Sequence, residues 1–227
     1  WIDLSTTDSE AAKSFYAGLF GWNYKDLPMP ETDSVYSMAH FDNNFIAGLG
    51  PQSPEMMEQG VPPVWSSYIK HDNVDEISAR VVKAGGTVIM PPMDIMESGR
   101  MLMAVDSTGA AFGVWQPNQH IGAQLVNQPN TMIWNELQTH DVDQAKEFYT
   151  AVFGWGSQVA ENGYVTFQVE GRTQAGLMKI QEDWGEVPPN WSVYFMVEDV
   201  HASAEKIKEL GGNLLGPPYR IAEMGEM

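Results

Sequence analysis

Residues 1–22, WIDLSTTDSEAAKSFYAGLFGW, return as residues 134–155, WNELQTHDVDQAKEFYTAVFGW. The two stretches align without a gap, and 11 of their 22 positions carry the same residue. Residues 61–101 return in the same way as residues 187–227, with 15 of 41 positions identical. The chain is therefore a tandem duplication of a unit of roughly 115 residues, a usual size for one domain.

Each copy of the opening stretch predicts a short strand followed by an amphipathic helix. Polar and apolar residues alternate over the first six positions, which is typical of a strand with one buried face. Asp8 and Asp141 stand where helix N-caps are expected, and Gln144 is placed to complete a capping box. Gly21 and Gly154 stand where left-handed C-caps are expected. The apolar stripes of the two helices consist of Ala12, Phe15, Tyr16 and Leu19, and of Ala145, Phe148, Tyr149 and Val152.

The remainder of each copy predicts further strands and one more helix. Residues 25–34 and 51–63 are rich in proline and polar residues, so we expect them to form loops. Each copy then consists of two βαβββ-like halves, which is an α+β architecture. The expected strands are 35–41, 45–49, 65–70, 87–90, 101–105 and 112–116, with 164–169 and 174–178 in the second copy, and the expected second helix of the first copy is 74–84.

The repeat predicts two domains joined by a linker. Domain 1 is expected over residues 1–116 and domain 2 over residues 131–227, because residues 117–130 have neither helical nor strand periodicity. Residue 101 is followed by two expected strands, whereas its counterpart, residue 227, is the last in the sequence. We therefore expect domain 2 to lack its final hairpin. The chain is expected to be a monomer of two pseudo-symmetric domains or a homodimer.

The composition excludes several classes of function. The 12 Lys and Arg residues face 30 Asp and Glu residues, and a formal net charge of −18 would repel nucleic acid and anionic membrane surfaces. The chain has no cysteine, which excludes disulfides and thiol catalysis. No apolar run approaches the ~20 residues of a membrane span. We therefore expect a cytoplasmic protein that binds neither nucleic acid nor membrane.

These motifs resemble those of the vicinal oxygen chelate superfamily of glyoxalases, bleomycin resistance proteins and extradiol dioxygenases. The resemblance rests on the Ala-Lys-x-Phe-Tyr and Phe-Gly-Trp motifs after the Asp cap, on Trp-Ser-x-Tyr followed by a helix that ends in Gly-Gly, and on residues 106–115, DSTGAAFGVW. It covers nearly the whole chain. It is similar in particular to the two-domain, glyoxalase-like branch that includes a mycobacterial culture-filtrate antigen and actinobacterial proteins labelled hydroxylases. The resemblance implies tandem glyoxalase-like domains, each of two βαβββ halves whose curved sheets form a cup for the substrate.

The resemblance also implies a divalent metal held by His, Gln or Glu, and this sequence departs from that pattern. The first-strand position, seven residues before the capping Asp, holds Trp1 in one copy and Trp134 in the other. The equivalent positions of the second halves hold Ser66 and Ser192, and the last-strand position holds Gly113. None of these side chains supplies an imidazole or a carboxylate. We therefore predict no cofactor, with a divalent metal bound outside these positions as the alternative.

Strand alternation indicates which side chains face the cup. If Leu4 and Leu137 pack toward the helices, the opposite face carries an aromatic wall with few polar groups, as small-molecule sites commonly do. The expected ligand is a small aromatic or polycyclic molecule. The expected ligand-binding residues are Trp1, Asp3, Ser66, Tyr68, Lys70 and Trp115 in the first copy, and Trp134, Glu136, Ser192 and Tyr194 in the second.

Two carboxylates on this face, Asp3 and Glu136, are candidate general bases, because a buried charge without a partner is costly and is often functional. Lys70 is a candidate partner for Asp3, and the sequence indicates none for Glu136. Two alternatives stay open. The aromatic side chains could fill the cup as core, and the carboxylates could be hydrated at strand ends.

Three classes of function follow from this pattern. The first is a metal-free binding protein for a small molecule, like the bleomycin resistance proteins. The second is an enzyme of the same superfamily, such as a lyase, a hydroxylase or a dioxygenase. The third is a non-catalytic interaction domain whose cups are filled by side chains.

Overall fold

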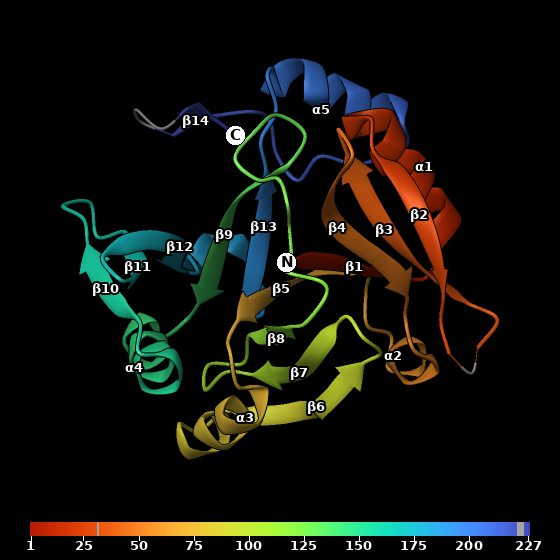
Figure 1. The fold of residues 1–227 in the computed structure, drawn as a ribbon. Coiled ribbons are helices and arrows are strands. Elements are labelled where there is room, and N and C mark those ends of the chain that lie inside the picture. The colour runs from red at the N-terminus through yellow and green to blue at the C-terminus, as the bar shows by residue number, and fades with distance from the viewer. Residues whose placement is uncertain (31, 222–224) are drawn as a thin grey trace. The chain divides into compact units, whose positions relative to one another are not determined.

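A computed structural model describes residues 1–30, 32–221 and 225–227 of the chain. Four modules follow one another, and each begins with one strand and one helix (Figure 1). The first two modules are β1 (Ile2–Thr6), α1 (Ser9–Phe20), β2 (Asn23–Pro28), β3 (Val35–Phe41) and β4 (Asn44–Pro51), then β5 (Val64–Lys70), α3 (Val74–Lys83), β6 (Thr87–Ile95), β7 (Gly99–Val105) and β8 (Ala111–Pro117). The last two are β9 (Met132–Thr139), α4 (Val142–Phe153), β10 (Gly156–Val159), β11 (Val165–Val169) and β12 (Arg172–Lys179), then β13 (Asn190–Phe195), α5 (Val200–Glu209), β14 (Arg220–Ile221) and β15 (Gly225–Glu226).

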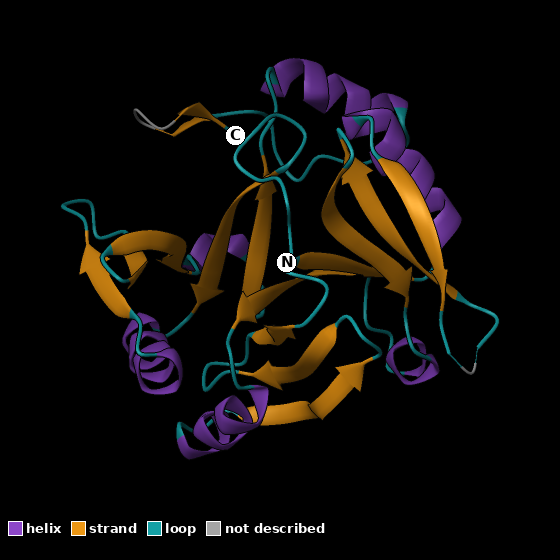
Figure 2. Cartoon of the chain, viewed as in Figure 1, coloured by secondary structure: helices purple, strands orange, loops and turns teal. Residues whose placement is uncertain are grey.

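The order of elements confirms the expected α+β architecture of βαβββ halves, with strands as the larger part (Figure 2). A short helix, α2 (Pro54–Glu58), and a single 3₁₀ turn over Glu182–Trp184 lie between modules. Residues 118–131 form neither helix nor strand. None of the helices in the described part of the chain has the length and apolar character that crossing a bilayer requires.

The caps of the two repeated helices form as expected. The side chain of Asp8 accepts a hydrogen bond from the backbone N–H of Ala11, and Asp141 accepts one from Gln144 in the same way. Both helices end at a glycine with φ of 71°, a left-handed conformation that glycine adopts without steric cost. The capping box does not close, because the side-chain amide of Gln144 donates to the carbonyl of Ser107 instead (3.0 Å).

Two loops expected from the sequence are partly regular in the structure. Residues 25–28 belong to β2, which pairs antiparallel with β3, so the loop prediction was wrong there; Glu31 lies outside the described residues. An edge strand has one unpaired side, and it therefore tolerates the charged residues and the terminal Pro28 that suggested a loop. The connection after β4 contains α2, because Ser53 caps it and Pro54 starts it.

Two compact units divide the described chain, and they do not follow the order of the repeats. The first unit joins the second module to the third, whereas the second unit joins most of the first module to the α5 module. The first consists of residues 1–3, 65–122 and 134–194, and the second of residues 4–64, 123–133 and 195–227. The domains and the linker expected from the repeat stay a prediction.

The sheets of the first unit repeat one mixed pattern. The strand orders are β5-β8-β7-β6 and β10-β11-β12-β9-β13. In each, the first strand of a module runs parallel to the last strand of that module, and the module's other pairs are antiparallel. Helix α3 lies against β6, β7 and β8, and α4 lies against α3 and β12 (Figure 1).

The core of the first unit is shared between its two modules. Both helices supply fully buried side chains, and so do strands from each sheet. Burial of these apolar groups is the main force that holds the modules together. The core includes Val74, Ile77 and Val81 of α3, Ala145, Phe148, Tyr149 and Val152 of α4, and Leu102, Phe112, Leu137, Phe167, Leu177 and Trp191 of the strands.

A buried chain of hydrogen bonds crosses this core. Asp106, in the turn before β8, accepts a hydrogen bond from the hydroxyl of Tyr149 (3.0 Å), and that hydroxyl accepts one from the indole N–H of Trp191 (2.8 Å). Asp106 also accepts bonds from Thr108 and Ala110 of its own turn. Burial, followed by the charge of Asp106, raises the pKa of Tyr149 well above its ordinary value, so the hydroxyl stays a neutral donor.

Replacing Phe148 by alanine tests this core. Phe148 is 2% exposed and packs against Phe112 and Tyr149. We expect Phe148→Ala to lower the free energy of unfolding by ~3–5 kcal/mol, because it removes a buried aromatic ring and leaves a cavity. Denaturant melts at matched pH measure the change. The exposed neighbour Glu147→Ala is the control, and equal midpoints for the two variants would contradict the helix register.

Candidate functional site

Strand β9 presents two different faces, and the polar one carries the candidate site. Leu137 is fully buried in the core of the first unit. Because side chains alternate along a strand, Trp134, Glu136 and Gln138 point to the opposite face. The neighbouring strands β12 and β13 flank β9 in the sheet (Figure 1). We name the residues joined on this face the Glu136 cluster; they are Trp134, Glu136, Gln138, Tyr164, Asn190, Ser192 and Tyr194.

The carboxylate of Glu136 lies at the centre of the cluster and is 7% exposed. The hydroxyl of Tyr164 donates to Oε2 (2.6 Å), and the hydroxyl of Tyr194 donates to Oε1 (3.0 Å). The amide of Gln138 lies at 3.5 Å from Oε1, the limit of a hydrogen bond. A carboxylate with two short bonds from hydroxyls is held in one orientation.

A second layer of hydrogen bonds orients these partners. The indole N–H of Trp134 donates to the hydroxyl of Tyr164 (3.1 Å). Asn190 donates to the side-chain carbonyl of Gln138 (3.5 Å) and accepts from the hydroxyl of Ser192 (2.9 Å). Trp134 and the two tyrosines are partly buried, so part of each residue remains accessible to solvent.

Gly176 makes the cluster sterically possible. It lies opposite Glu136 in the parallel pair of β12 and β9. A Cβ atom at this position would lie 1.9 Å from the hydroxyl oxygen of Tyr164 and 2.8 Å from Nε1 of Trp134. Any other residue would therefore displace Tyr164 from the carboxylate and Trp134 from the hydroxyl of Tyr164.

Within the part of the chain that the structure describes, the carboxylate of Glu136 has no counter-ion. Its partners are neutral hydroxyl and amide groups, and among the described residues no Lys, Arg or His forms an ion pair with it. Burial and then the hydrogen bond to Glu136 raise the pKa of Tyr164 above its ordinary value. Tyr164 is therefore a neutral hydrogen-bond donor at neutral pH.

The ligand-binding residues predicted in the second copy lie together in the structure, whereas fewer of those predicted in the first copy do so. Trp134, Glu136, Ser192 and Tyr194 all belong to the Glu136 cluster. The sequence offered no partner for Glu136, and the structure corrects this by supplying Tyr164 and Tyr194. Tyr164 was missed because only its position at the start of an expected strand was visible, and strand register is not readable from one chain.

In the first copy, the rings of Trp1 and Trp115 both pack against the ring of His120. Trp115 is 7% exposed, and its indole N–H donates to the carbonyl of His120 (2.8 Å). The ring of Trp1 meets that of His120 edge-on, with centroids 4.4 Å apart. This packing favours the core-filling alternative for Trp115. Of the remaining predicted residues, Asp3, Ser66 and Tyr68 are partly buried and Lys70 is exposed.

The metal positions of the superfamily do not fit a divalent ion in this chain. A Cβ atom at Gly113, the last-strand position, would lie 2.3 Å from the ring of Tyr68, so the tyrosine occupies the space of a ligand there. In the second copy, Trp134 at the first-strand position is bonded to Tyr164. Within the described residues, no three His, Asp or Glu side chains gather in a way that could hold a metal ion.

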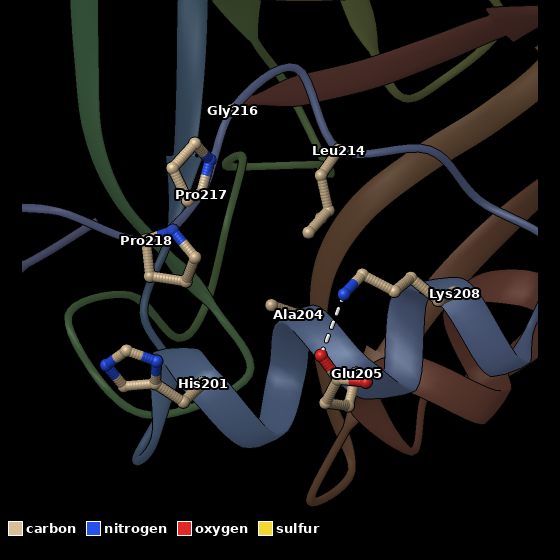
Figure 3. Close-up of a pocket in the computed structure, with 8 residues that line it drawn as sticks. All are labelled: His201, Ala204, Glu205, Lys208, Leu214, Gly216, Pro217 and Pro218. Atoms are coloured by element: carbon tan, nitrogen blue, oxygen red, sulfur yellow. Dashed lines mark hydrogen bonds and ion pairs between the residues drawn. The ribbon is translucent and has the colours of Figure 1, made fainter.

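A cavity of about 350 Å³ lies in the second unit, beside α5 (Figure 3). Its charged groups Glu205 and Lys208 pair with each other (2.8 Å), and more than half of each side chain is exposed. No buried polar group of the lining points to a specific ligand, so the Glu136 cluster is the stronger candidate site. The lining is His201, Ala204, Glu205, Lys208, Leu214, Gly216, Pro217 and Pro218.

The raised pKa of Tyr164 predicts a pH dependence of stability. An unfolded tyrosine loses its proton near its ordinary pKa of 10.0, whereas folded Tyr164 keeps it to higher pH. The contribution of Tyr164 to the free energy of unfolding is therefore fully present below about pH 10. It decreases as the pH rises further, by at most about 1.4 kcal/mol per pH unit. We expect the stability of Tyr164→Phe to fall less steeply above pH 10 than that of wild type, in denaturant melts. Tyr219→Phe, at an exposed position, should keep the wild-type slope, and an unchanged slope in Tyr164→Phe would refute the assignment.

Comparison with known proteins shows which family the chain belongs to. A family model described as the Glyoxalase/Bleomycin resistance protein/Dioxygenase superfamily matches residues 1–114 and 122–223. "Putative glyoxylase CFP32" of Mycobacterium tuberculosis (strain CDC 1551 / Oshkosh) is 43% identical over 229 residues, covering 99% of this chain and 87% of that protein. "Anthracycline biosynthesis protein DnrV" of Streptomyces peucetius is 32% identical over 231 residues, covering 96% of this chain and 83% of that protein.

Solved structures share the fold at low sequence identity. The Mn(II)-bound glyoxalase from Novosphingobium aromaticivorans aligns with a TM-score of 0.61 at 15% identity, covering 97% of this chain and 73% of that one. The 2,2',3-trihydroxybiphenyl 1,2-dioxygenase from Sphingomonas wittichii strain RW1 aligns with a TM-score of 0.61 at 12% identity, covering 98% and 81%. The resemblance seen in the sequence motifs is thereby confirmed. The chain belongs to the glyoxalase, bleomycin resistance protein and dioxygenase superfamily.

Proposed function

We propose that this member of the superfamily binds a small aromatic or polycyclic molecule at the Glu136 cluster, without a metal. The observation that carries the proposal is a buried carboxylate held by two tyrosine hydroxyls beside a tryptophan ring. Small-molecule sites commonly combine aromatic walls with a few polar groups in set positions. The cluster has both features on one face of a sheet.

The aromatic side chains supply the apolar part of the site. Tryptophan and tyrosine offer large, rigid rings with few rotatable bonds, which suits contact with a planar ligand. Trp134 and Tyr164 are hydrogen-bonded to each other, and Tyr194 is hydrogen-bonded to Glu136. These side chains therefore lose little conformational entropy when a ligand binds.

The carboxylate supplies orientation. An ionised carboxylate offers about four acceptor positions, and three described residues donate to Glu136, one of them at the 3.5 Å limit. One acceptor position on Oε2 is therefore available to a hydroxyl or N–H group of the ligand. This hydrogen bond would orient the ligand, whose aromatic ring contacts Trp134.

The names of relatives support an aromatic ligand. One relative at 32% identity is named an anthracycline biosynthesis protein, and anthracyclines are polycyclic aromatic compounds. Another is named a glyoxylase, and this keeps an enzyme of the glyoxalase or dioxygenase type as the alternative function. We place the protein in the cytoplasm as part of the proposal, on its acidic, cysteine-free composition.

Removing the tryptophan ring tests the binding site. We expect Trp134→Ala to weaken binding of 9-anthracenemethanol by about tenfold, which corresponds to roughly 1.4 kcal/mol for a lost aromatic contact. Anthracene fluorescence titration measures the affinity. Trp184→Ala removes a tryptophan that is 40% exposed elsewhere in the same unit and should leave the affinity unchanged. Absence of anthracenemethanol binding to wild type, or equal losses in the two variants, would count against the site.

A metal analysis tests the proposal that the site works without a metal. We expect protein purified without chelators to carry far less than one divalent metal ion per chain, because Trp134, Ser192 and Gly113 supply no suitable ligands. Elemental analysis measures the content. A stoichiometric metal, or a glyoxalase or ring-cleaving activity that a chelator abolishes, would establish the enzyme alternative instead.

A further inference from the structure

We propose that the ligand of the Glu136 cluster carries a protonated amine, which forms an ion pair with the Glu136 carboxylate. The inference rests on the proposed function and specifies its ligand class. It starts from the charge of the cluster, since an aromatic surface alone would accept neutral rings equally well.

The cluster holds a negative charge that the described protein groups do not neutralise. Glu136 is 7% exposed, and its partners are the neutral side chains of Tyr164, Tyr194 and Gln138. A carboxylate removed from water is costly unless it is paired with a cation. A ligand ammonium group would supply the missing positive charge.

The hydrogen-bond pattern leaves a position for that group. Oε1 of Glu136 receives Tyr194 and, at the distance limit, Gln138, whereas Oε2 receives Tyr164 alone among the described residues. A carboxylate oxygen accepts two hydrogen bonds. The second acceptor position of Oε2 is therefore the place for an ammonium N–H.

The surrounding rings favour a cation over a neutral donor. Trp134, Tyr164 and Tyr194 are linked to the carboxylate by the same hydrogen-bond chain. The face of an aromatic ring attracts a cation within about 6 Å, and tryptophan does so most strongly. An ammonium group bound to Glu136 would have a counter-ion, and a ring face turned toward it would add to the attraction. The net charge of −18 also raises the encounter rate with cations.

Three probes that share one ring system separate charge from shape. They are 9-(aminomethyl)anthracene, which is a cation at pH 7, the neutral 9-anthracenemethanol, and anthracene-9-carboxylate. We expect the amine to bind wild type at least about tenfold more tightly than the alcohol, and the carboxylate to bind most weakly. In Glu136→Gln, the preference for the amine should fall to less than about threefold while the alcohol still binds.

Two controls distinguish the site from general attraction to an acidic surface. Glu147→Gln removes one exposed charge elsewhere in the first unit and should keep the wild-type preference. The preference should also persist in about 0.5 M NaCl, because salt screens exposed charges more than buried ones. A preference that survives in Glu136→Gln, or that disappears in salt, would overturn the inference.

The wild-type protein provides a test that does not depend on a variant folding. Nuclear Overhauser contacts should connect the methylene of the bound amine with ring protons of Trp134, Tyr164 or Tyr194. Contacts only with other rings would refute the inference. Equal affinities for amine and alcohol would also refute it while leaving the proposed function intact, whereas no binding by any probe would remove both.

Discussion

The first unit depends on the buried hydrogen bonds from Trp191 through Tyr149 to Asp106. They connect β13, α4 and the turn that precedes β8, and they bring a motif of the first copy against two motifs of the second. A hydrogen bond to a buried charged group contributes roughly 1.5–3 kcal/mol, and leaving such a group unsatisfied costs more. The apolar core supplies most of the free energy, but these bonds select which modules pair. This explains why motifs far apart in the sequence belong to one compact unit.

The same core also positions the candidate site. Strand β9 packs Leu137 into the core and thereby directs Glu136 to the opposite face, because successive side chains alternate. A slip of one residue would place Glu136 among the apolar side chains and expose Leu137. The cost of burying that charge therefore supports the register that the binding face requires. Stability and site geometry depend on one strand.

The solved structures that share the fold of this chain include a Mn(II)-bound glyoxalase and a 2,2',3-trihydroxybiphenyl 1,2-dioxygenase. In this chain the tyrosine rings of Tyr68 and Tyr164 lie over glycines, where a larger residue would collide with them. Gly113 is at a position where the superfamily pattern places a metal ligand. Fold membership alone therefore does not establish a metal reaction, and function must be argued from the side chains.

Local sequence signals determined the elements of this protein, and the tertiary structure decided their partners. The repeat, the Asp caps and the Gly C-caps predicted α1 and α4 correctly, because capping and amphipathic periodicity act within a few residues. The alternation around Leu137 also predicted the face of Glu136. The pairing of the second module with the third, the strand β2 and the contribution of Tyr164 were not predictable in this way. Each depends on contacts between residues distant in the chain, which are set by how buried surfaces and hydrogen bonds are best satisfied together.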